Sequence, residues 1–251
     1  MADLGFLIDL HRDGDRQGPG DVAETRLAVL LSGLRGGKGL KIADIGSGTG
    51  ASALVLAREL DATVTAVDLA QDFLSILKVR AKREGLADRI RTLAASMHSL
   101  PFDEASFDAI WSEGAIYNMG FASGIKAWRR FLKPGGVLAV SDLTWLTHER
   151  PVELEQYWVR EYIEVDLPSS KIGLLEQFGY SPIGYFSLGK HSWLENYYRP
   201  LQSRFDSFLA RHGGSDAARS IVDAEKREID LYERYAAFIS YGYYVAIRVD
   251  G

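Results

Sequence analysis

Hydrophobic residues in the first 142 positions form short runs that alternate with longer stretches of helical spacing. The short apolar runs, which predict buried strands, are 40–45, 62–67, 90–94, 107–112 and 137–141. The stretches 51–60, 71–84 and 123–132 place apolar side chains three and four residues apart, as in a helix packed on one side. Strands that alternate with helices predict an α/β fold built on a parallel sheet.

The rest of the chain predicts further helices around two more strands. Helical patterns cover 3–10, 22–34, 151–162, 169–178, 191–212 and 215–238, and strand patterns cover 183–188 and 241–249. Asp21 with Glu24 forms a capping-box pattern before the second helix, and Ser215 can cap the last one. We expect a single domain over 1–251, with a lid at about 1–20 and helical cap insertions at about 143–166 and 190–240.

A glycine-rich turn follows the first predicted strand. Asp44 ends that strand, and Gly46, Gly48 and Gly50 recur at every second position before the helix that begins at Ala51. Glycine lets a ligand lie against bare backbone, and the N-terminus of a helix provides free N–H donors. The turn is therefore the predicted ligand site, and later features can be placed relative to it.

Two ligand classes fit this turn. The spacing Gly46-x-Gly48-x-x-Ala51 satisfies the loose dinucleotide fingerprint, so an NAD-dependent oxidoreductase is one alternative. Asp44 favours the other, because a carboxylate at the strand end repels a pyrophosphate and attracts a cation. S-adenosylmethionine carries a sulfonium, an ammonium and no phosphate. Asp68, at the end of the second strand, suits the two ribose hydroxyls of either ligand.

The amino-acid composition and net charge limit the kinds of molecule that the protein is expected to bind. The chain has 251 residues, 47% of them hydrophobic, which is enough for a full core, and a net charge of −5 that argues against nucleic acid as the main partner. The sequence has no cysteine, no histidine spacing typical of a metal site and no apolar run of membrane-spanning length. With an acidic N-terminus unlike a signal peptide, these features predict a cytoplasmic protein without a bound metal.

Several motifs occur in a characteristic order. They are Asp44–Gly50, Asp68, the segment 100–102, Phe107-Asp108 and the segment 132–136. This order, over roughly residues 16 to 142, resembles a class I S-adenosylmethionine-dependent methyltransferase. The segments 16–20, 111–118 and 191–198 resemble a narrower set of bacterial members, mostly without assigned substrates.

The resemblance implies a Rossmann-like sheet of seven strands, mostly parallel, with the last strand antiparallel and helices on both faces. It also implies cofactor contacts at Asp44, Gly46, Gly48, Asp68, Leu69, Ser96, Met97 and Glu113. To these we add Ser47 and Gly114 in the same turns, and Arg16, which we expect to pair with the carboxylate of the cofactor from the lid. The alternative for 11–20 is a solvated linker.

Aromatic residues, most of them in the second half of the chain, form the candidate acceptor pocket. Eleven of the twelve tyrosines follow residue 150. We expect Tyr117, Trp145, Tyr162, His191, Trp193 and Tyr197 to contribute to this pocket, although each could instead only hold the extra helices in place. His191 and Tyr117 are the candidate catalytic residues, with His191 as general base and His148 as second choice.

The function we expect is methyl transfer to a small-molecule acceptor by in-line displacement. This chemistry needs mainly alignment and desolvation, because the leaving group is already activated. Because this chemistry needs so few dedicated catalytic groups, the sequence is also compatible with a protein that binds S-adenosyl ligands without turnover. An acceptor on protein or RNA fits less well, because the insertions suggest a closed pocket and the chain is acidic.

Overall fold

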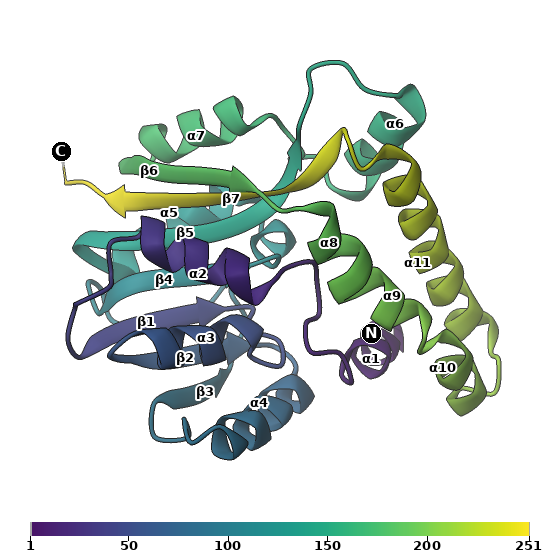
Figure 1. The fold of residues 1–251 in the computed structure, drawn as a ribbon, viewed down its shortest axis with the longest axis horizontal. Coiled ribbons are helices and arrows are strands. Elements are labelled where there is room, and N and C mark those ends of the chain that lie inside the picture. The colour runs from purple at the N-terminus through teal and green to yellow at the C-terminus, as the bar shows by residue number, and fades with distance from the viewer. Residues whose placement is uncertain (1, 251) are drawn as a thin grey trace.

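The computed structural model describes residues 2–250 and is built on one seven-stranded sheet (Figure 1). The strands are β1 (Leu40–Ile45), β2 (Ala62–Asp68), β3 (Ile90–Ala94), β4 (Phe107–Glu113), β5 (Leu132–Trp145), β6 (Tyr180–Ser187) and β7 (Ile239–Arg248). Their order is β3-β2-β1-β4-β5-β7-β6. Strand β7 runs antiparallel to both neighbours and the other paired strands are parallel, which confirms the predicted sheet.

Successive residues of the central strands enter two different cores. Ile42 and Trp111 belong to the cluster on one face, whereas Ala43 and Ile110 belong to the cluster on the other. This alternation follows from the period of two in a strand, and both faces are apolar because helices cover both. The central strands are therefore continuous apolar runs in the sequence, without the alternation of polar and apolar residues that marks a strand with one exposed face.

Helices cover the two faces of the sheet in separate layers. α2 (Val22–Leu31) and α3 (Ala51–Glu59) pack on one face, while α5 (Phe121–Trp128) and α7 (Pro168–Gln177) pack on the other. α4 (Gln71–Arg83) packs beside β2 and β3, and two 3₁₀ turns, η1 (Ile116–Asn118) and η2 (Arg129–Phe131), flank α5.

The remaining helices gather beyond the end of the sheet toward which the β1 arrow points in Figure 1. They are α1 (Ala2–His11), α6 (Val152–Glu161), α8 (Lys190–Trp193), α9 (Arg199–Gln202), α10 (Phe205–Arg211) and α11 (Asp216–Tyr235). The predicted helix over 191–212 is interrupted by a π-helical turn, η3 (Leu194–Tyr198), and again between α9 and α10. α1 packs against α10, where the rings of Phe6 and Phe208 lie 6.2 Å apart edge to face.

The predicted start of α2 is correct for one of its two residues. The backbone N–H of Ala23 donates to Asp21 Oδ1 at 2.7 Å, so Asp21 is the N-cap. Glu24 does not complete the capping box, because its Oε1 accepts from the backbone N–H of Gly189 at 3.0 Å. Glu24 thus ties α2 to the start of α8, a contact between residues 165 positions apart.

A buried ion pair fixes the segment after α6 to the sheet. Lys171 on α7 pairs with Asp142 on β5, and both side chains are almost fully buried. Tyr162 donates to Asp142 Oδ2 at 2.9 Å and accepts from the backbone N–H of Phe121 at 3.2 Å. The pair therefore holds Tyr162, at the C-terminal end of α6, in a defined position above β5.

We predict that Lys171→Met lowers the free energy of unfolding by about 3 kcal/mol, because it leaves the buried carboxyl group of Asp142 without its ion-pair partner. Urea unfolding would measure the loss, with Lys78→Met on the exposed face of α4 as the control. Asp142→Leu combined with Lys171→Met should recover part of the loss. A single variant as stable as the control would contradict this account of the pair.

Candidate functional site

A cavity of about 710 Å³ lies at the carboxyl edge of β1, β2 and β4 and extends toward the helices beyond the sheet. One end is formed by the turns that follow these strands. The other is formed by side chains of α1, α6, η3 and α11. We call these the turn end and the cap end. This is the edge at which open parallel sheets bind ligands.

The turn end brings together the predicted cofactor residues. Arg16, Gly46, Ser47, Gly48, Asp68, Leu69, Ser96, Met97, Glu113 and Gly114 all line the cavity. Asp44 is the exception, because its side chain is fully buried beneath the turn and does not line the cavity. The expectation that Asp44 contacts a ligand directly is therefore not supported by its position.

The glycine turn has room for backbone only. Gly46 and Gly48 have φ values of 75° and 53°, which favour glycine. A Cβ at Gly46 would collide with Ala115, and one at Gly48 would collide with Gln17 Oε1. Gln17 Oε1 also accepts from the backbone N–H of Thr49 at 2.8 Å. The turn is thus closed on one side by the 11–20 segment, which is ordered against it and is not a solvated linker.

Asp68 is held with its carboxylate at the cavity wall. Its Oδ2 accepts from the backbone N–H of Gly48 and its Oδ1 from that of Ala70, both at 2.8 Å. Burial raises the pKa of Asp68 even though these backbone donors favour its ionised form. Each oxygen keeps a second lone pair, so the carboxylate can also accept hydrogen bonds from two hydroxyl groups. This geometry fits the ribose role predicted for Asp68.

Two polar atoms beside the turn have no hydrogen-bond partner within residues 2–250. They are Ser47 Oγ, which belongs to a residue lining the cavity, and Asp44 Oδ1 beneath it. Asp44 Oδ2 accepts from Ser52 Oγ at 2.7 Å. Burial raises the pKa of Asp44 to about 7, and the nearby carboxylates of Glu113 and Asp68 add to the effect. The carboxylates of Asp68 and Glu113 on the cavity wall oppose a pyrophosphate and favour a ligand with positive charge.

Arg16 and Glu113 form an ion pair at the wall of the turn end. Arg16 Nη1 donates to Glu113 Oε2 at 2.7 Å, and both side chains are about nine-tenths buried. Glu113 Oε1 also accepts from Thr25 Oγ1 at 2.8 Å, from Trp111 Nε1 at 3.0 Å and from the Tyr243 hydroxyl at 3.1 Å. Glu113 is therefore well supplied with donors. Arg16 retains guanidinium N–H groups for an anionic ligand group.

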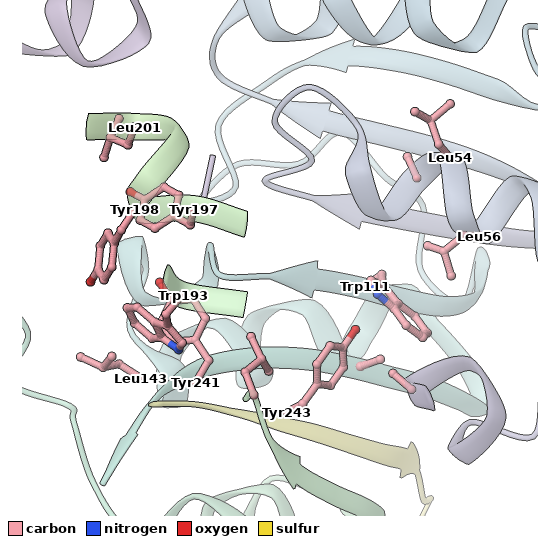
Figure 2. Close-up of a cluster of buried hydrophobic side chains, with 14 of the residues drawn as sticks. Leu54, Leu56, Trp111, Leu143, Trp193, Tyr197, Tyr198, Leu201, Tyr241 and Tyr243 are labelled. Carbon is pink, nitrogen blue, oxygen red and sulfur yellow. The ribbon is translucent and has the colours of Figure 1, made fainter. Parts of the chain in front are cut away.

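Most, but not all, of the predicted aromatic residues reach the cavity. Tyr117, Tyr162, Trp193 and Tyr197 line it. Figure 2 shows Trp193 and Tyr241 close together, with Tyr197 and Tyr198 on the neighbouring helical turn. The Trp193 and Tyr241 ring centroids lie 4.9 Å apart, and Trp193 Nε1 donates to Ser240 Oγ at 2.9 Å. These contacts fix the orientation of the indole.

Three predicted residues need correction. His191 does not line the cavity: its side chain is 63% exposed and lies 3.4 Å from Asp21 Oδ2. Trp145 is buried below the guanidinium of Arg150, 4.5 Å from its ring centroid, and His148 is exposed. A position shortly after a strand does not determine where a side chain points once helices follow, so His191 is no longer a candidate base. Tyr117 lines the cavity and remains a candidate catalytic residue.

Several residues at the cap end were not predicted. They are His11, Tyr157, Trp158, Glu161, Glu225, Glu228 and Tyr241. One signal was available in the sequence. Along α11 the stripe of Ala218, Val222, Ile229 and Tyr232 is buried, and Glu225 occupies the helical position between Val222 and Ile229. A glutamate within an apolar stripe indicates a carboxylate that faces the interior.

Residues 2–250 contain neither a candidate metal site nor a helix that could span a membrane. No group of three or more His, Asp or Glu side chains in residues 2–250 could hold a metal ion. Likewise, none of the described helices has both the length and the apolar character needed to cross a bilayer.

Known proteins resemble this chain in both sequence and fold. Residues 42–136 match a family model described as a methyltransferase domain. Methyltransferase GfsG of Streptomyces halstedii is 38% identical over 107 residues, covering 42% of this chain and 38% of that protein. The 27-O-demethylrifamycin SV methyltransferase of Amycolatopsis mediterranei is 32% identical over 143 residues, covering 55% and 52%. These matches span about half or less of the relatives' own length.

A solved structure matches nearly the whole chain. A methyltransferase from Geobacter sulfurreducens, in complex with S-adenosyl-L-homocysteine, has a TM-score of 0.81 at 18% identity, over 99% of this chain and 98% of that one. Residues 42–136 therefore match a methyltransferase domain, and the chain as a whole has the fold of an S-adenosylmethionine-dependent methyltransferase. The matched domain ends at residue 136, before α6 begins. The cap end is therefore the part that the family match does not describe.

We predict that the ligand-free protein loses stability as pH rises from 5 to 8. Asp44 and Glu228 each have a pKa raised to about 7, mainly by burial. The folded state keeps protons on these acids in a range where the unfolded chain, with pKa values near 4, has released them. The free energy of unfolding should fall by roughly 5 kcal/mol across this range, about half of it from each group.

Urea unfolding at a series of pH values would measure this slope. Asp44→Asn should flatten it, whereas Asp223→Asn on the exposed side of α11 should leave it unchanged. A slope of the opposite sign, or equal slopes for Asp44→Asn and the wild type, would show that Asp44 is not held protonated by burial.

Proposed function

We propose that this methyltransferase transfers a methyl group from S-adenosylmethionine to a small-molecule acceptor. The observation that carries the proposal is one continuous cavity, which joins the turn end to an aromatic cap end. Its volume, about 710 Å³, falls within the range of about 300–1,000 Å³ typical of ligand pockets. A cofactor at the turn end would face an acceptor at the cap end.

The turn end has the chemistry that the cofactor requires. Asp68 would accept the ribose hydroxyls, Arg16 would pair with the carboxylate, and Ser47 Oγ is free to bond a polar atom of the amino-acid part. Met97 and Leu69 offer apolar surface to the adenine. The bound cofactor supplies an electrophilic methyl group on a sulfonium sulfur.

The chain itself supplies position and exclusion of water. The 11–20 segment covers the glycine turn through Gln17, and α1 places Leu4, Leu7 and His11 on the cavity wall. At the cap end, Tyr162 is fixed by Asp142, and Trp193 by Ser240. Rigid aromatic walls hold an acceptor in one orientation and remove water from it, and methyl transfer depends chiefly on these two effects.

A small acceptor agrees with the shape of the site and with a relative. The cavity is walled by α1, α6, η3 and α11 rather than opening as a long groove. The Amycolatopsis relative is named for a small molecule, demethylrifamycin SV. A protein that binds the cofactor without turnover has the same turn end. It differs from an enzyme only in giving no product with any acceptor.

The first test is calorimetric titration with S-adenosylmethionine, S-adenosylhomocysteine and NAD. We expect both S-adenosyl ligands to bind and NAD not to bind, because the carboxylates of Asp68 and Glu113 line the turn end. Transfer of label from methyl-labelled S-adenosylmethionine to a panel of small amines, phenols and acids then tests turnover. Binding of NAD alone would overturn the proposal in favour of an oxidoreductase.

We predict that Asp68→Ala weakens the binding of S-adenosylhomocysteine by at least about 100-fold. Two hydrogen bonds to a carboxylate are lost, each worth roughly 1.5–3 kcal/mol, and about 1.4 kcal/mol corresponds to a factor of ten. Calorimetry would measure the change. Asp72→Ala, at an exposed acid in the first turn of α4, is the matched control. Equal affinity for both variants would remove Asp68 from the site.

We predict that Arg16→Gln weakens S-adenosylhomocysteine about tenfold but leaves adenosine almost unchanged, because adenosine has no carboxylate. The comparison of two ligands on one variant separates this role from a general loss of structure around Glu113. Arg12→Gln, at an exposed arginine of the same segment, serves as control. Equal losses for the two ligands would show that Arg16 shapes the turn rather than binding the carboxylate.

A further inference from the structure

The cap end of the cavity is strongly acidic, and this feature bears on the acceptor of the proposed reaction. Glu161 from α6 and both Glu225 and Glu228 from α11 line it. Arg16, at the turn end, is the only arginine or lysine on the cavity wall within the described residues. Glu161 pairs with Arg160, which does not line the cavity, at 3.2 Å, whereas Glu225 and Glu228 have no Lys or Arg counter-charge on that wall.

Glu225 and Glu228 are the two carboxylates that α11 places at the cap end of the cavity. They stand three residues apart on α11 and so share a face of the helix. Glu228 Oε1 accepts from the Tyr198 hydroxyl at 2.8 Å, and Glu225 Oε1 lies 3.5 Å from His11 Nε2. Burial, followed by repulsion from Glu225, raises the pKa of Glu228 to about 7. Two neighbouring carboxylates are costly to ionise there unless a cation joins them.

A second observation points independently to a ligand. Trp158 and His11 both line the cap end and each is only 8% exposed. Trp158 Nε1 and His11 Nδ1 are buried and have no hydrogen-bond partner among residues 2–250. Buried polar groups are normally paired, so these two nitrogens indicate that a polar molecule completes the site.

The walls around the two carboxylates are aromatic. The His11 and Tyr197 rings stack with centroids 6.0 Å apart, and Tyr157 and Trp158 meet edge to face at 5.1 Å. Burial, together with the charges of Glu225 and Glu228, raises the pKa of Tyr197 well above its usual value, so its ring stays neutral. Neutral aromatic faces beside carboxylates are the surroundings that proteins use to hold organic cations.

We propose that the acceptor is an organic amine, bound as a cation by Glu225 and Glu228 against the aromatic faces of Tyr197 and Trp158. Before transfer the ammonium gives one proton to one of these carboxylates. The freed nitrogen lone pair then forms the bond to the methyl carbon as the bond from that carbon to the sulfonium sulfur breaks, and neutral S-adenosylhomocysteine leaves. This inference rests on the proposed function and adds the chemical class of its substrate. The indole N–H of Trp158 is then available to an oxygen or neutral nitrogen elsewhere in the same molecule.

Matched probes that differ only in charge test the inference without turnover. The protein saturated with S-adenosylhomocysteine is titrated at pH 8 with two series: propylamine, propanol and propionate, then phenethylamine, 2-phenylethanol and phenylacetate. Calorimetry and tryptophan fluorescence report binding. We expect the amine to bind about tenfold tighter than the alcohol in at least one series, and the acid to bind most weakly. No preference for the amine in either series, including no binding of any probe, overturns the inference.

Variants of α11 assign the preference to its carboxylates. Glu225→Gln and Glu228→Gln should each bring the amine and alcohol affinities to within about twofold of each other. Glu233→Gln, at an exposed position of the same helix, should keep the preference. All three should bind S-adenosylhomocysteine like the wild type, which shows that the fold is intact. A preference that survives both cavity variants overturns the inference.

The two proposals fail in different ways. If S-adenosylhomocysteine does not bind the wild-type protein, the proposed function is wrong. If it binds but the alcohols bind as tightly as the amines, the function stands and only the amine class is wrong. A hydroxyl acceptor would then be the better choice.

Discussion

The ion pair between Arg16 and Glu113 is the interaction on which the arrangement of this site depends. Glu113 ends β4 and gathers donors from the N-terminal segment, from α2 and from β7, at Arg16, Thr25 and Tyr243. A buried carboxylate is stable only when such donors surround it, so the pair fixes the path of the 11–20 segment over the glycine turn. That path in turn places His11 at the far end of the cavity.

The two ends of the cavity carry different sets of charged side chains. The turn end combines acids with one arginine, which suits a ligand that carries charges of both signs. The cap end has acids and aromatic rings without lysine or arginine on the described wall. The cost of burying these acids appears as raised pKa values for Asp44 and Glu228. Binding sites commonly show such perturbed groups, because they are arranged for a ligand rather than for stability.

Sequence reasoning succeeded where position along the chain determines position in space. Gly46, Asp68 and Ser96 follow three strands of one parallel sheet, and the carboxyl ends of such strands meet at one edge. It failed for His191 and Trp145, which follow β6 or end β5 but point away from the cavity. The direction of these side chains depends on how the inserted helices pack, and no local pattern encodes that.

The sequence alone thus determined the strands, the sheet they form and the turn end, because apolar periodicity and glycine spacing are local properties of the chain. Only the tertiary structure decided the cap end. Glu225 meets His11 across more than two hundred positions, through packing of α1 and α11 that depends on every element between them. Contacts at such sequence separation depend on how the whole chain folds. The side chains that would contact the acceptor are brought together by contacts of this kind.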